Sequence, residues 1–113
     1  MTSLSFKSAA SGAGLAALAV LLAGATLAST KAGDAAHGEE LARRWCASCH
    51  VVAPDQTRGA DSVPTFATIA GRPGFDADKL ARFLMDPHPK MPDMELSRTE
   101  ARDLAAYIAT QAR

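Results

Sequence analysis

The sequence predicts an all-α domain of about four helices, and three observations support this fold class. Only 5% of the 113 residues are aromatic, with one Trp and one Tyr, which is few for a packed β-sandwich. Alanine-rich stretches carry apolar residues at helical spacing. The last stretch opens with a helix-capping sequence, Ser97-Arg98-Thr99-Glu100. A chain of this length forms one domain with a small core.

The charge balance excludes one class of partner. Twelve Lys plus Arg residues balance twelve Asp plus Glu residues. We therefore expect no strong electrostatic field and no nucleic-acid partner.

Residues 1–28 have the features of an export signal, followed by a short polar linker at 29–33 and the domain at 34–113. The leader carries one charge, Lys7, then a weakly apolar stretch and small residues at Thr26-Leu27-Ala28, where a signal peptidase would cleave. An uncleaved membrane anchor is the alternative. Both place the domain in the periplasm, and membrane contact is expected only if the leader is retained.

The first helix is predicted to begin after Asp34 as N-cap and to run through Leu41, Trp45 and Cys49 at i, i+4 spacing. Gly38 lies inside it, where glycine costs about 1 kcal/mol relative to alanine. We expect Gly38 to mark a close helix crossing; a frayed first turn is the alternative.

That helix carries Cys46-Ala47-Ser48-Cys49-His50, a CxxCH sequence. In an exported chain this is the attachment signature of c-type haem, in which each thiol adds across one vinyl group and the imidazole ligates the iron. A disulfide, a thioredoxin-type redox pair and half of a zinc site are the alternatives. They are disfavoured because the chain has no second cysteine pair and no βαβ pattern, and because a disulfide would leave His50 without a role.

The middle of the chain is predicted as a loop at 51–63, a short helix at 64–71 ended by Gly71, and a third helix with Asp76 as N-cap. The apolar stripe expected on the third helix is Ala77, Leu80, Phe83 and Leu84. Pro87 should end it, because proline disfavours helix at the preceding residue. Residues 88–95 contain two further prolines and are predicted to form a stiff, non-helical strap.

The last helix follows the capping box at Ser97. Its apolar residues recur at a period of 3.6, with Tyr107 beside them; they are Ala101, Leu104, Ala105 and Ile108. This face needs a partner. Gly38 offers one, because a residue without a side chain lets Leu104 and Tyr107 approach its backbone.

Taken in order, these residues resemble a small class I cytochrome c, and the resemblance covers 34–109. In that family a glycine lies eight residues before the first haem cysteine, as Gly38 does before Cys46. The loop after CxxCH leads to a proline and a Gly-Arg pair, here matched by Pro64, Phe66, Ile69, Gly71 and Arg72. The axial methionine precedes a C-terminal aromatic residue by about sixteen positions, as Met91 precedes Tyr107.

The resemblance implies roles for six residues. Cys46 and Cys49 would form the thioethers to one haem c, with His50 as proximal and Met91 as distal iron ligand. Pro64 would accept a hydrogen bond from the second imidazole nitrogen of His50, and Arg72 would lie near a haem propionate. Two departures put the helix crossing and the propionate contacts in doubt: Ala42 is small where relatives often carry a bulkier residue, and the second half has no Trp.

Some assignments have rivals. Met94 could replace Met91 as the ligand, although it is otherwise a core residue, and His88 could ligate the iron instead. Lys90, Arg43 and Arg44 could surround the haem edge and attract an acidic partner, or form an ordinary solvated face. His37 is most simply a solvated surface residue.

Iron held by imidazole and thioether has no open coordination position, which argues against catalysis, and the soft thioether favours ferrous iron. We therefore expect a periplasmic one-electron carrier that is not an enzyme. Its donor would be a dehydrogenase or bc-type complex, and its acceptor a terminal oxidase or reductase. The alternatives are a haem subunit of a larger oxidoreductase and a haem enzyme or gas sensor with a labile Met91.

Overall fold

A computed structural model describes residues 31–86 and 89–113, and in these residues the predicted all-α fold is confirmed. The predicted leader, most of the linker, Pro87 and His88 lie outside the described residues. The helices are α1 (Ala35–Leu41), continued by the π-helical turn η1 (Ala42–Cys46), then α2 (Phe66–Ala70), α3 (Ala77–Met85) and α4 (Arg98–Ala109). In the described residues no helix is long and apolar enough to span a bilayer.

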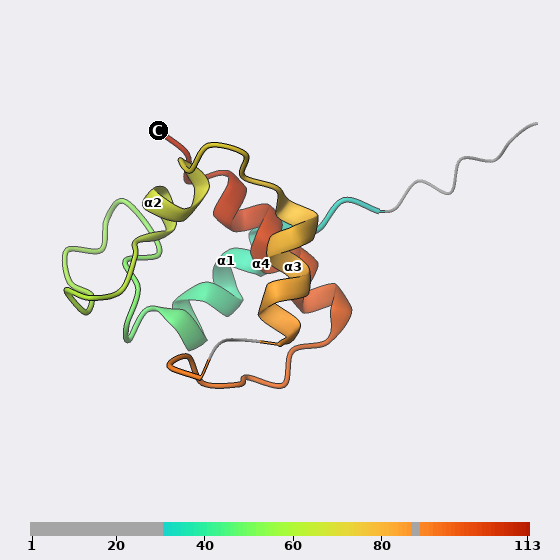
Figure 1. Ribbon diagram of the computed structural model, residues 1–113, viewed down its shortest axis with the longest axis horizontal. Helices are drawn as coiled ribbons and strands as arrows, with labels where there is room; N and C mark the ends of the chain where they lie inside the picture. Colours follow the sequence, from blue (N-terminus) through green and yellow to red (C-terminus); the bar gives the residue numbers. More distant parts are fainter. Residues whose placement is uncertain (1–30, 87–88) are drawn as a thin grey trace, which may run out of the picture.

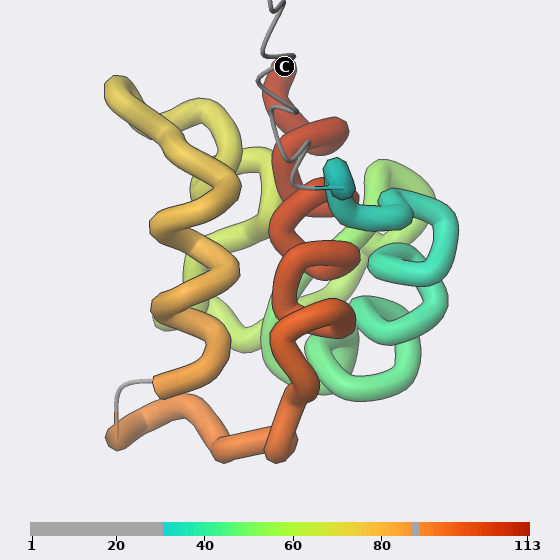
Figure 2. Tube along the Cα trace, turned by 90° about the vertical axis from the view of Figure 1, so that its right-hand side faces the viewer, coloured from blue at the N-terminus to red at the C-terminus, as the bar shows by residue number. Residues whose placement is uncertain are grey.

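Helix α4 is the centre of the fold. Figure 2 shows α1 and η1 on one side of α4 and α3 on the other, with residues 89–97 crossing below them to the foot of α4. The most extensive contacts join α4 to α1 and to α3 (Figure 1). The sequence explains the central position, because α4 is buried on a broad face; its buried residues are Ala101, Asp103, Leu104, Ala105, Tyr107 and Ile108.

The predicted helix caps are confirmed. The Asp34 side chain accepts hydrogen bonds from the backbone of Ala36 and His37, and Asp76 accepts one from Lys79. Ser97 and Glu100 form both halves of a capping box. Each bond satisfies a backbone N–H that a helix start leaves without a partner, so these starts could be read from the sequence.

Gly38 marks the close crossing of α1 and α4, as expected. It is buried, and a Cβ at this position would overlap the backbone carbonyl of Asp103 and lie 2.9 Å from the Cβ of Tyr107. Ala42 is completely buried as well, so its small size allows the crossing that the sequence left in doubt. The chain just before α1 is also close to α4, because a Cβ on Gly33 would overlap the carbonyl of Arg102.

The predicted end of the first helix was wrong. The helix does not continue to Cys49, and its last turn is π-helical, with the N–H of Ala47 bonded to the carbonyl of Ala42 at 3.1 Å. This wider turn shifts the helix face, so that Ala42 and Cys46 point into the core and Trp45 is 53% exposed. An i, i+4 pattern cannot anticipate such a change.

The start of α2 and the buried face of α3 also differ from the prediction. Helix α2 begins at Phe66, because the side chain of Thr65 caps it by accepting from the N–H of Thr68 at 3.0 Å; Pro64 therefore lies outside the helix. On α3 the buried residues are Ala81 and Leu84, whereas Phe83 is 42% exposed. The predicted stripe misplaced Phe83, while Ala77 and Leu80 pack partly buried against the core as expected.

Candidate functional site

The two cysteines lie at the end of η1 and in the turn that follows. The backbone N–H groups of Cys49 and His50 both bond to the carbonyl of Cys46, at 3.1 and 2.8 Å, so the turn brings the two thiols and the imidazole together. Both thiols are free, Cys46 buried and Cys49 exposed.

Burial raises the pKa of the Cys46 thiol to about 11, which keeps it protonated at neutral pH. A thioredoxin-type redox pair needs a thiol with a lowered pKa, so this environment does not favour that alternative. No group of three or more His, Cys, Asp or Glu residues that could hold a metal ion occurs in the described parts of the chain.

The His50 ring is oriented by a backbone acceptor. Its Nδ1 lies 2.7 Å from the carbonyl oxygen of Pro64, the contact that the family resemblance implies. The Phe66 ring packs beside the imidazole at 5.5 Å between centroids, and the Phe66 N–H bonds to the carbonyl of Val51 at 3.0 Å. With Nδ1 donating its proton to Pro64, Nε2 is the nitrogen left for a metal.

The strap carries the two methionines whose thioether sulfur could ligate the iron. Met91 and Met94 are both partly buried against the core, and Leu96 is fully packed within it. Glu95 has a φ of 52°, a left-handed conformation that is uncommon for a residue with a side chain. The two methionines thus share the same kind of environment, and a substitution experiment must separate them.

The remaining predicted residues lie outside this group. Arg72 is exposed, two residues past the end of α2, with its backbone N–H bonded to Ile69. Arg43 is paired with two carboxylates, Glu39 at 2.8 Å and Asp55 at 3.1 Å. Its positive charge is therefore neutralised locally, which weakens the idea that Arg43 attracts an acidic partner.

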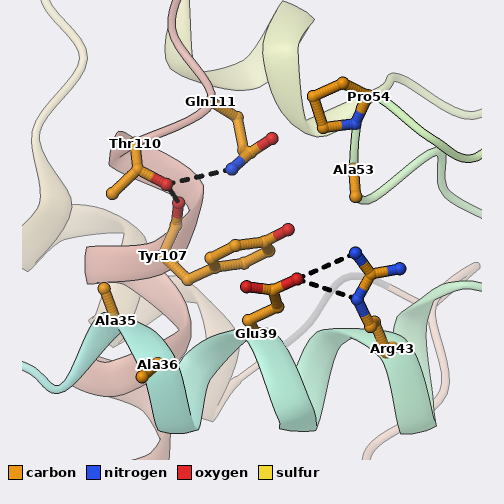
Figure 3. A pocket seen from close by; sticks show the side chains of 9 residues that line it. All are labelled: Ala35, Ala36, Glu39, Arg43, Ala53, Pro54, Tyr107, Thr110 and Gln111. Atoms are coloured by element: carbon orange, nitrogen blue, oxygen red, sulfur yellow. Dashed lines mark hydrogen bonds and ion pairs between the residues drawn. The ribbon is translucent and has the colours of Figure 1, made fainter.

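Glu39 and Arg43 border an open pocket of about 360 Å³ between α1, α4 and residues 53–54. Figure 3 shows Glu39 and Arg43 along one edge of this pocket, with the Tyr107 ring beside them. None of the CxxCH residues lines it. The pocket is thus separate from the candidate site.

Sequence reasoning missed the polar contacts of three residues, although it had named Tyr107 beside the apolar face of the last helix. Tyr107 donates from its hydroxyl to the carbonyl of Val52 at 2.9 Å and so ties α4 to the loop after CxxCH. The Gln56 side chain bonds to four backbone groups, those of Val52 and Arg58 in that loop and those of Ala47 and His50 in the CxxCH sequence. Asp103 is a buried carboxylate; an acidic residue on the apolar face of the last helix was the one signal that could have revealed it.

Asp103 connects the middle of α4 to the start of α1. Its Oδ1 accepts from the N–H of Asp34 at 2.7 Å, and its Oδ2 lies 2.8 Å from Nδ1 of His37. His37 is a surface residue as expected, with its side chain 44% exposed, and the structure adds that its ring is paired with Asp103. The hydrogen bond to Asp103 raises the pKa of His37. Burial alone would raise the pKa of Asp103, but its bonds to His37 and to Asp34 bring the net pKa below the usual value.

A pH-dependent contribution to stability follows from the His37–Asp103 pair. Because the folded-state pKa of His37 is raised above 6.5, its contribution is complete below pH 6.5 and is lost as the pH rises through the folded pKa. Because the pKa of Asp103 is lowered below 3.8, its contribution is present above pH 3.8 and is lost as the pH falls through the folded pKa. His37→Ala should thus destabilise the protein at pH 5 and have a smaller effect at pH 9.

Urea unfolding of the unsubstituted protein and of His37→Ala at pH 5 and pH 9 measures how the loss of stability depends on pH. Asp103→Asn is the matched control, because it keeps an acceptor for the Asp34 N–H and removes the charge; it should abolish the pH dependence of the His37→Ala effect. An equal loss at pH 5 and pH 9 would show that the pair carries no charge interaction.

The donor set fits a c-type haem. Two free thiols, an imidazole with its Nδ1 already bonded and a thioether on the strap are the groups that such a cofactor requires.

The chain matches the family described as "Cytochrome C oxidase, cbb3-type, subunit III" over residues 33–108. Cytochrome c-552 of Bradyrhizobium diazoefficiens is 57% identical over 91 residues, which cover 80% of this chain and 88% of that protein. A crystal structure of a cytochrome c2 mutant aligns with a TM-score of 0.45 and 26% identity, covering 69% of this chain and 97% of that one.

Proposed function

This chain belongs to the small class I c-type cytochromes and binds one haem c covalently, and from this premise we propose that it is a periplasmic one-electron carrier with His50 and Met91 as iron ligands. When bound, the haem supplies an iron that alternates between its ferrous and ferric states. The observation that carries the proposal is the His50 Nδ1 to Pro64 carbonyl distance of 2.7 Å beside two free cysteines.

Each residue has a separate task in this function. Cys46 and Cys49 hold the cofactor through thioether bonds, so that it stays attached in both oxidation states. Pro64 holds the His50 ring in place and strengthens it as a donor to the metal. Met91 contributes a soft thioether that favours the reduced state. The apolar residues Phe66, Ile69, Leu80 and Leu84, which are buried or partly buried, keep water away.

Carbon monoxide distinguishes a carrier from an enzyme or sensor. With both axial ligands in place, the ferrous protein should bind carbon monoxide slowly and incompletely at neutral pH. Rapid stoichiometric binding would favour the alternative in which Met91 leaves the iron.

A reduced-minus-oxidised spectrum together with an intact mass on periplasmic material tests the covalent haem, the location and the removal of residues 1–28 at once.

A subunit of a larger oxidoreductase is the second candidate, and the description of the matched family as an oxidase subunit favours it. Against it, this chain covers 88% of cytochrome c-552, so that relative is about as small as this protein. For a free carrier we propose a dehydrogenase or bc-type complex as donor and a terminal oxidase or reductase as acceptor. Purification at native abundance decides: a free carrier elutes alone, and a subunit elutes with its complex.

A further inference from the structure

The side chain of Gln56 organises the loop that follows the haem-attachment sequence. Its Oε1 accepts from the N–H of Val52 at 3.0 Å. Its Nε2 faces three backbone carbonyls, those of Ala47 at 3.0 Å, His50 at 2.8 Å and Arg58 at 2.6 Å. An amide nitrogen has two protons, so one of them is shared between two carbonyls.

Two of these carbonyls belong to the CxxCH sequence itself. The carbonyl of His50 is held by Gln56, its backbone N–H by the carbonyl of Cys46 at 2.8 Å, and its ring by Pro64. His50 is therefore restrained at its backbone N–H, at its backbone carbonyl and at its imidazole. Gln56 is the one side chain in this set of restraints, because the other partners are backbone atoms.

We propose that Gln56 is a positioning residue for His50, which sets the orientation of the axial imidazole and thereby the reduction potential. The proposal rests on the proposed role of His50 as iron ligand. By fixing the backbone at His50, Gln56 keeps Nδ1 in line with the Pro64 carbonyl. That hydrogen bond makes the imidazole a stronger donor, and a stronger donor stabilises ferric iron.

Two substitutions test the role. Gln56→Glu keeps the length of the side chain but places a carboxylate without protons against three carbonyls, and Gln56→Met keeps the bulk but removes all hydrogen bonds. Gln56→Met should raise the reduction potential, because a loosened Nδ1–Pro64 bond weakens the imidazole donor. The negative charge of Gln56→Glu opposes such a rise, so the effect of that variant is read from proton exchange. Exchange of the His50 ring N–H with solvent should become about tenfold faster or more.

The control is Gln111→Glu, which makes the same chemical change at a residue whose side chain bonds to the neighbouring Thr110. It should change neither the potential nor the exchange of the His50 proton. Stability alone does not decide, because any loop residue could affect it. If both Gln56 variants unfold less cooperatively but keep the potential and the exchange rate, Gln56 has only a structural role and the proposal is overturned.

A measurement on the unsubstituted ferrous holoprotein covers the case in which the variants do not fold. The carboxamide protons of Gln56 should exchange with solvent far more slowly than those of Gln111; equal rates overturn the proposal. Failure of the proposed function looks different: the His50 ring signals would then show no bond to iron in the unsubstituted protein. If His50 is bound to iron and the Gln56 variants keep the reduction potential and the exchange rate of the His50 proton, only the positioning role is overturned.

Discussion

The Met91→His variant is expected to have a much lower reduction potential than the unsubstituted protein. The thioether is a soft ligand that stabilises ferrous iron, whereas a second imidazole is a harder and more basic donor that stabilises the ferric state. Axial ligands tune haem potentials over a range of about 0.8 V, so the fall should be a sizeable part of that range. Spectroelectrochemical titration measures the potential, and the methionine-to-iron absorption of the ferric protein should disappear.

Met94→Leu is the matched control, because Met94 lies three residues further along the same strap and is also partly buried against the core. Leucine keeps its apolar bulk, so the potential and the methionine-to-iron absorption should be nearly unchanged. The opposite pattern, in which the Met94 change alone removes that absorption, would make Met94 the distal ligand. The strap would then meet the iron three residues closer to α4.

The Gly38→Ala variant is expected to be less stable by about 2 kcal/mol, although alanine is the better helix former by about 1 kcal/mol. The added Cβ would overlap the carbonyl of Asp103 and lie 2.9 Å from the Cβ of Tyr107. Both atoms are close to the α4 backbone, so the two helices must separate. At roughly 4–8 °C per kcal/mol for a domain of this size, Tm should fall by roughly 8–16 °C in a thermal unfolding experiment on the ferric holoprotein.

Gly71→Ala is the control for this second prediction. Gly71 ends α2 with an ordinary φ of −79°, and a Cβ there would lie 3.2 Å from the carbonyl of Ala67, a tight but tolerable contact. We expect a small change in Tm. If Gly38→Ala were as mild as Gly71→Ala, or stabilising, the crossing of α1 and α4 would not require glycine.

Both predictions start from features that the sequence already carried, and the reason is that their signals are local. A cap requires one side chain next to one helix start, so Asp34, Asp76 and Ser97 could be recognised from their neighbours. A glycine inside a helical pattern has a cost in free energy, so its presence at Gly38 indicated a close approach. The CxxCH spacing is set by the cofactor and is also read within five residues.

The features that the sequence could not show depend on which segments meet. The pairing of His37 with Asp103 joins residues 66 positions apart, and the bond from Tyr107 to Val52 spans 55. Gln56 looks like any polar loop residue until the loop folds around its amide. Trp45 was misplaced because a π-helical turn alters the helix face, and that turn forms where η1 packs against the rest of the domain.

The sequence by itself determined the fold class, the starts of α1, α3 and α4 and the glycine at the crossing, and it predicted the haem-attachment residues, because each is encoded by short-range spacing and by the chemistry of single residues. Only the tertiary structure decided which polar groups support the site and which apolar residues are exposed. A buried hydrogen-bonding group must find a partner wherever the chain brings one within reach, and that partner is selected by packing across the domain rather than by distance along the chain.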